Sequence, residues 1–187
     1  MTQSVQMREP EIAGRLERLR PSLDGAGCDA LLVTNLVNVR YLTGFTGSAA
    51  LLLVRADGVV LTTDGRYRDQ AAEQTAAAGV DATIEVRPTL AAQHEVLASA
   101  ADGVARLGLE AESVTWAQQR RFAADVFARA ELVPTDGLVE DLRRVKDQGE
   151  VSRMAAWIAS ISIGSSNDSL TQAARCNHRA APGARGH

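Results

Sequence analysis

The stretch NVRYLTGFTGSAALLLV, residues 38–54, decides the fold because it joins the end of a helix to a buried strand. Asn35 is a favourable N-cap for a short helix over Leu36–Thr43. Gly44 suits the left-handed backbone position that commonly ends a helix. The apolar run from 49 to 54 then predicts a strand. A polar, glycine-containing turn therefore lies between two packed elements.

Upstream of this stretch, the sequence predicts a helix that opens at Pro10–Glu11 and a buried strand over 29–34. Pro21 lacks an amide donor and crowds the preceding turn, so we expect a kink or an early stop near Arg20. The segment Gly25-Ala26-Gly27 ends the element. The apolar face of this helix is formed at helical spacing by Ile12, Leu16, Leu19 and Leu23.

Downstream, the Asp57–Gly58 dipeptide predicts a hairpin that returns through a strand over Val59–Thr62. Asp64 is expected to cap a helix over 65–78, which Gly79 closes. Further strands are predicted at 82–86, 106–109 and 131–133, and further helices at 89–101 and at 116–128 with Ser113 as its cap. This alternation indicates an α/β domain with a mixed β-sheet flanked by helices.

The composition is that of a soluble globular protein, with 45% hydrophobic and 23% charged residues among 187. The net charge of −3 gives no electrostatic basis for binding nucleic acid or an anionic membrane. No apolar run approaches the roughly 20 residues of a membrane span. The N-terminus lacks the apolar core of a signal peptide, so we expect a cytoplasmic protein in which Cys28 and Cys176 are free thiols.

The chain divides into three predicted parts: a core domain over 1–142, a linker with the start of a new helix over 143–160, and a tail over 161–187. Asp147 and Glu150 form a capping-box-like pair at the start of that helix. The tail is small, polar and basic, which predicts disorder. The apolar stripe of the new helix comprises Val151, Met154, Ala155, Ile158 and Ile161.

Three motifs together carry a family resemblance: LVNVRYLTGFTGS at 36–48, TTDGRYRDQA at 62–71 and VEDLRRVKDQGEV at 139–151. In order and separation they resemble the N-terminal domain of Xaa-Pro peptidases, the group of prolidase, aminopeptidase P and creatinase. The resemblance covers residues 11–153 and stops where a catalytic domain should begin. It implies a ribonuclease H-like mixed sheet for this domain.

The resemblance also implies where the chemistry of the family resides. Family members hold two divalent metal ions, manganese or cobalt, in a second domain of the pita-bread fold. There a metal-bridging hydroxide attacks the peptide bond that precedes proline, since two metals lower the pKa of the bridging water and polarise the carbonyl. We therefore expect no cofactor, no metal ligand and no catalytic residue in this chain.

Residue types that often carry chemistry are present but poorly arranged. His94 falls in a predicted helix and is expected to be a surface or satisfied histidine. Ser48 in GFTGS does not fit the G-x-S-x-G pattern of a nucleophile elbow. Asp64 reads most simply as a helix cap. In the tail, His178, His187 and Cys176 do not form a site, and the equal spacing of Asp125, Asp136 and Asp147 is taken as coincidence.

The junction around Phe45 keeps two interpretations. In the first, Tyr41 and Phe45 fill the core and Gly47 allows a close backbone approach. In the second, the junction is an interface. By resemblance to enzymes in which an N-terminal domain borders the active-site mouth of a partner subunit, Arg40, Phe45 and Ser48 would lie near substrate.

Three hypotheses about function follow. The first is a non-catalytic N-terminal domain of an Xaa-Pro peptidase-like protein, cut short before the catalytic domain, with a role in packing or oligomerisation. The second is a binding module that pairs with itself or with an intact paralogue. The third is part of a complete metal-dependent Xaa-Pro aminopeptidase or dipeptidase.

Overall fold

The computed structural model describes residues 12–145 together with Val151, Ala155 and Ile158. Within 12–145 a mixed sheet has the strand order β4-β3-β2-β1-β5-β6. The β1–β2 and β2–β3 pairs are antiparallel, and the β3–β4, β1–β5 and β5–β6 pairs are parallel. The strands are β1 (Ala30–Val33), β2 (Ala50–Arg55), β3 (Val59–Thr63), β4 (Thr83–Val86), β5 (Arg106–Glu110) and β6 (Glu131–Thr135).

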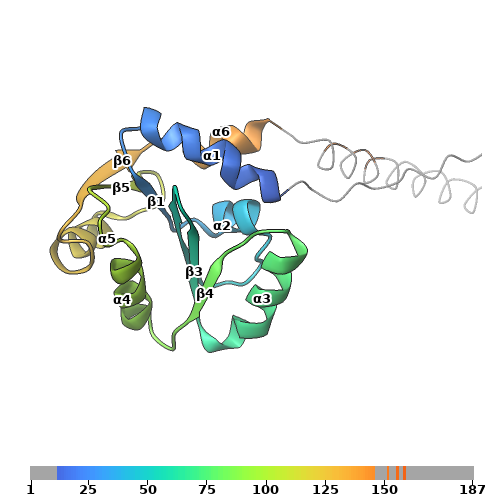
Figure 1. The fold of residues 1–187 in the computed structure, drawn as a ribbon, viewed down its shortest axis with the longest axis horizontal. Helices are drawn as coiled ribbons and strands as arrows, with labels where there is room; N and C mark the ends of the chain where they lie inside the picture. The colour runs from blue at the N-terminus through green and yellow to red at the C-terminus, as the bar shows by residue number, and fades with distance from the viewer. Residues whose placement is uncertain (1–11, 146–150, 152–154, 156–157, 159–187) are drawn as a thin grey trace, which may run out of the picture. The chain divides into compact units, whose positions relative to one another are not determined.

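Helices cover both faces of the sheet, which confirms the predicted α/β class (Figure 1). Alternate residues of each strand point to opposite faces, so Leu31 and Val33 belong to one core and Ala30 and Leu32 to the other. The first core packs against α1 (Ala13–Gly25), α2 (Leu36–Thr43), α3 (Arg68–Ala77) and α6 (Leu138–Arg144). The second packs against α4 (Leu90–Ala100) and against Phe122 and Phe127, at the two ends of the segment that follows α5 (Trp116–Arg121).

The local predictions around residues 38–54 are confirmed. The Asn35 side chain accepts a hydrogen bond of 3.0 Å from the amide of Val37 at the start of α2. Gly44 ends α2 in the left-handed conformation with φ of 77°. The β2–β3 pair forms the predicted hairpin, and Asp64 caps the 3₁₀ turn η1 (Gly65–Tyr67), which leads into α3.

The predicted early stop of the first helix is wrong, because α1 continues through Pro21 to Gly25. Pro21 is exposed, so the carbonyl that loses its helical donor can be hydrated. Leu16, Leu19 and Leu23 are almost completely buried on the opposite side. Burial of this face outweighs the local cost of the proline.

The predicted helix over 116–128 is also corrected. Its cap is Thr115, which forms a capping box with Gln118, and not Ser113. The α-helix ends at Arg121 and continues as the π-helix η2 (Phe122–Val126), in which the amide of Phe127 donates to the carbonyl of Phe122 at 2.7 Å. The wider turn brings both phenylalanine rings into the second core, with centroids 5.7 Å apart.

The last strand runs past the point where the sequence predicted its end. β6 includes Pro134 and ends at Thr135. The amide of Glu131 donates to Ala105, and the carbonyl of Thr135 accepts from Ala111. These two residues therefore face β5, and the nitrogen of Pro134 faces the free edge of the sheet, where no partner strand needs a donor.

The helix α6 was not predicted, although its sequence has a clear signal. Leu138, Val139 and Leu142 are spaced to face one side, with acidic residues in the first turn and arginines in the last. The predicted Asp147–Glu150 cap and the tail over 161–187 lie outside the described residues, as does most of the linker over 143–160. No helix in the described part is long and apolar enough to cross a bilayer.

Candidate functional site

A cleft lies at the end of the sheet where the carboxyl ends of several strands meet. β1, β3 and β4 run in the same direction, because β1 and β3 are both antiparallel to β2 and β3 is parallel to β4. Crevices outside the carboxyl ends of strands are where open α/β sheets commonly bind ligands. The cleft here has a volume of about 340 Å³, and its lining includes Thr34, Leu36, Ser48, Asp64, Leu90 and Gln93.

Two apolar side chains form the lip of this cleft. Leu36 opens α2 and is 37% exposed, and Leu90 opens α4 and is 52% exposed. Val37, next to Leu36 on α2, is 53% exposed. Apolar side chains from two separate helices are therefore exposed to solvent beside the carboxyl ends of the same strands.

The loop that follows α2 is hydrogen-bonded to α3 beside the cleft. The amide of Thr46 donates to the side-chain oxygen of Gln74 at 2.8 Å, and Gln70 and Gln74 each donate to the Thr46 hydroxyl at 2.9 Å. Beneath the loop, Phe45 is 1% exposed and meets the ring of Tyr67 edge-on, with centroids 5.8 Å apart. The loop is thus fixed from α3 and from the core before anything binds.

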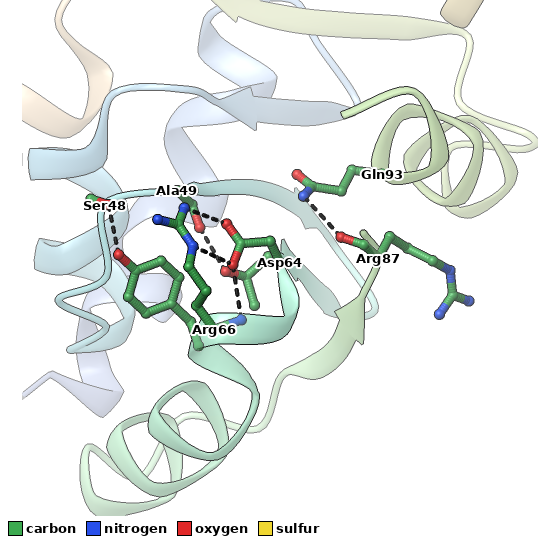
Figure 2. A network of polar contacts seen from close by, with 8 residues as sticks. Ser48, Ala49, Asp64, Arg66, Arg87 and Gln93 are labelled. Atoms are coloured by element: carbon green, nitrogen blue, oxygen red, sulfur yellow. Dashed lines mark hydrogen bonds and ion pairs between the residues drawn. The ribbon is translucent and has the colours of Figure 1, made fainter. Parts of the chain in front are cut away.

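Ser48 and Tyr67 form a polar pair at the surface. Their hydroxyl oxygens lie 2.7 Å apart, which is hydrogen-bond distance. The hydrogen bond with Ser48 lowers the pKa of Tyr67 below its ordinary value. Figure 2 shows Ser48 at the left of the view, and Asp64 and Arg66 lie between it and Gln93.

Asp64 and Arg66 form an ion pair at the end of β3. Two guanidinium nitrogens of Arg66 donate to the two carboxylate oxygens of Asp64 at 3.0 and 2.8 Å, and the backbone amide of Arg66 donates to the same carboxylate at 3.0 Å (Figure 2). The hydrogen bond from Arg66 lowers the pKa of Asp64. This geometry agrees with the predicted capping role of Asp64, and it leaves that carboxylate ionised and occupied.

The three residues predicted to lie near substrate occupy different environments. Arg40 is exposed on α2, one turn from Leu36, and Ser48 is exposed in the loop. Phe45 lies between them in sequence, but its side chain is in the core. Arg40 and Ser48 are therefore the two members whose side chains can meet another molecule.

A buried carboxylate behind α2 was missed from the sequence. Glu110 ends β5 and is 7% exposed. Its carboxylate accepts from the amides of Thr34 and Asn35 at 2.6 and 2.8 Å, and from the side-chain amide of Asn38 at 2.7 Å. It thereby fixes the start of α2. The available signal was a charged residue directly after the strand predicted over 106–109.

The other candidates do not converge on a site. His94 is half-buried, and its ring meets Phe122 edge-on with centroids 5.4 Å apart. Burial lowers the pKa of His94 and raises the pKa of the free Cys28 thiol. Asp125 and Asp136 are exposed, and Asp147, Cys176, His178 and His187 lie outside the described residues. Among the residues that the structure describes, no three His, Cys, Asp or Glu side chains could hold a metal ion together.

The chain is similar to peptidases and to isolated peptidase domains. It is 35% identical over 144 residues to the uncharacterized peptidase YqhT of Bacillus subtilis (strain 168). The aligned region covers 73% of this chain and 37% of that relative. An Xaa-Pro dipeptidase from Bacillus anthracis matches with a TM-score of 0.66 and 33% identity, again over 73% of this chain and 37% of that one. The chain thus spans little more than a third of the length of these relatives.

A smaller structure matches over its whole length. It is the N-terminal domain of the cytoplasmic peptidase PepQ from Mycobacterium tuberculosis H37Rv, with 40% identity and a TM-score of 0.60, covering 70% of this chain and 99% of that domain. The family model described as the creatinase/prolidase N-terminal domain matches residues 15–145, which include the sheet, the cleft and α6. The chain therefore belongs to the creatinase/prolidase N-terminal domain family of Xaa-Pro peptidases.

Proposed function

We propose that this chain is a non-catalytic N-terminal domain of an Xaa-Pro peptidase-like protein, whose role is to bind a second protein surface. The proposed contact is the α2 surface, defined as Leu36, Val37, Arg40, Ser48 and Leu90. Hydrolysis, with the pair of divalent metals that the family resemblance implies, is assigned to the catalytic domain of longer family members.

The observation that carries this proposal is the gathering of exposed apolar side chains around one cleft. Leu36 and Leu90 come from helices that follow different strands, yet they line the same 340 Å³ cleft. Exposed apolar patches of this kind mark interaction sites, because covering them gains roughly 25 cal/mol per Å² of apolar area removed from water.

The charge on this surface indicates what the partner presents. Arg40 is exposed, and no ion pair among the described residues involves it. A guanidinium suits bidentate contact with a carboxylate. In the complete enzyme Arg40 and Ser48 would lie near substrate at the mouth of the active site, and Phe45 would contribute by holding the loop from the core.

The proposed partner is a second copy of this chain or an intact paralogue that carries the catalytic domain. The proposed location is the cytoplasm, in line with the cytoplasmic peptidase whose N-terminal domain it resembles. Neither nucleic acid nor membrane is a proposed partner, since the net charge is −3.

The association is tested by sedimentation equilibrium of the chain alone and mixed with the intact paralogue. We expect Leu36→Asp and Leu90→Asp each to weaken association at least about 10-fold, because a charge would be buried in the interface. Trp116→Asp is the matched control, since Trp116 is 76% exposed on α5 and lines a different groove. Equal effects of the three substitutions, or a strictly monomeric wild type that binds no paralogue, would contradict the proposal.

Activity is tested separately. The purified chain with added Mn²⁺ is expected to leave Xaa-Pro dipeptides intact, and metal-dependent turnover would overturn the non-catalytic assignment. Since the peptidase relatives are much longer, the residue roles are tested in the full-length paralogue. There the substitution equivalent to Arg40→Ala is expected to lower kcat/KM while the metal content stays unchanged.

A further inference from the structure

Three polar contacts join α2 to α6, the helix that closes the described domain. The side-chain amide of Asn38 donates to Glu140 at 2.6 Å, and its oxygen accepts from Arg143 at 3.1 Å. One turn along α2, the Tyr41 hydroxyl donates to the carbonyl of Leu142 at 3.0 Å. The contacts are made by the inner face of α2, opposite Leu36 and Arg40, which are exposed.

Asn38 is completely buried and connects two carboxylates through one nitrogen. Its Nδ2 donates to Glu110 at 2.7 Å and to Glu140 at 2.6 Å, so both hydrogens of the amide are used. Glu110 also holds the backbone amides at the start of α2. Because the amide is planar, the orientation that serves Glu110 is the one that Glu140 and Arg143 stabilise from α6.

Displacement of α6 would therefore remove hydrogen bonds that hold α2 in place. Without Glu140 and Arg143, the side-chain amide of Asn38 keeps its contact with Glu110, and its oxygen and one hydrogen lose the partners that the described residues supply. A buried polar group left unpaired is costly, so the amide would reorient and the first turns of α2 would loosen.

We propose that α6 is a latch for the α2 surface: when α6 is seated, the Asn38 amide locks α2, and when α6 is displaced, α2 is released. The inference rests on the proposed function in one respect, namely that the α2 surface is the contact for a partner. Because coupling between two sites is reciprocal, a partner bound at α2 would also hold α6 more firmly in place.

The latch is tested by native-state hydrogen exchange on the full chain, comparing Glu140→Ala with Asp141→Ala. The two substitutions remove the same charge from neighbouring positions of α6. Among the described residues, the Asp141 side chain pairs with Arg144 on the surface, whereas Glu140 binds Asn38. A hydrogen bond to a charged group corresponds to roughly a 10- to 100-fold change in an equilibrium constant.

We expect the amides of α2 to exchange at least about 10-fold faster in Glu140→Ala, with α3 and α4 unchanged, and to stay at the wild-type rate in Asp141→Ala. Tyr41→Phe, which removes the contact with Leu142, should loosen the same helix. Equal rates in the two α6 variants, or acceleration spread evenly over all helices, would overturn the latch.

Binding to the paralogue separates this inference from the proposed function. Faster exchange in α2 together with weaker binding of Glu140→Ala supports both. Faster exchange in a chain that binds no partner supports the latch and contradicts the proposed function. Unchanged exchange in a chain whose binding depends on Leu36 does the reverse.

Discussion

Gly47 is predicted to be a position where a single added methyl group destabilises the folded domain. A Cβ at residue 47 would lie 2.1, 2.7 and 2.9 Å from three ring atoms of Phe45. Carbon atoms at rest are about 3.5–4.0 Å apart, so the ring would have to move by more than 1 Å. Phe45 is 1% exposed and packs against Tyr67, so a displaced ring would have to push into its neighbours in the core.

The expected cost of Gly47→Ala follows from this overpacking. Forcing an extra methyl into a well-packed core typically costs about 1–3 kcal/mol, and the severity of this contact points to the upper end. For a chain of 187 residues that lowers Tm by roughly 5–10 °C. Thermal and urea unfolding followed by circular dichroism give the free energy of unfolding of wild type and variant.

Two further variants make the test decisive. Gly58→Ala is the matched control, because a Cβ there would meet nothing within 4 Å. Its stability should lie within about 0.5 kcal/mol of wild type. Adding Phe45→Leu to Gly47→Ala should recover part of the loss, since the smaller side chain relieves the contact. If Gly47→Ala is as stable as Gly58→Ala, or if the double variant is simply additive, the steric argument is wrong.

Three shorter predictions concern polar groups. Glu110→Ala should destabilise the domain by about 3 kcal/mol, since two part-buried backbone amides and the buried side-chain amide of Asn38 lose an acceptor; urea unfolding measures this, and a loss below about 1 kcal/mol would contradict it. Burial lowers the pKa of His94 in the folded state, so the contribution of His94 to stability should be fully present above pH 7 and should be lost as the pH drops through about 6.5 towards that lowered pKa; the urea midpoint should change less with pH in His94→Gln. Ser48→Ala should raise the pKa of Tyr67, because the hydrogen bond that lowers it is lost; ultraviolet titration of the tyrosines checks this, and an unchanged curve would refute it.

Local chemistry made much of the fold predictable from sequence. Asn35 and Gly44 act within their own turns, so their capping roles follow from residue type alone. The Asp57–Gly58 hairpin is equally local. Each of these predictions depends on atoms only a few residues apart.

The corrections arise where the environment decides. Pro21 and Pro134 both lack a backbone amide hydrogen. Pro21 faces solvent on α1, whereas the nitrogen of Pro134 faces the free edge of the sheet. Neither direction can be derived from the residue itself. The π-helix after Arg121 likewise depends on how Phe122 and Phe127 fit the second core.

The site was harder to predict because its contacts are distant in sequence. Asn38 meets Glu110 across 72 positions and Glu140 across 102. The family resemblance pointed to Arg40, Phe45 and Ser48, whereas the other interpretation of the junction, that Phe45 fills the core, is confirmed by its 1% exposure and its contact with Tyr67. Exposure of Arg40 and Ser48 becomes known only when the face of α2 and the course of the loop are fixed.

The two edges of the sheet have a consequence for handling the protein. At the β6 edge, Pro134 replaces an outward amide, so an approaching strand finds one donor fewer. At the β4 edge, Glu85 pairs with Arg87 at 2.8 Å, which places charged side chains beside the open strand. Both features oppose amyloid-like growth by strand addition, so a concentrated solution of the domain should stay free of thioflavin-positive fibrils, and any self-association should proceed through helix surfaces.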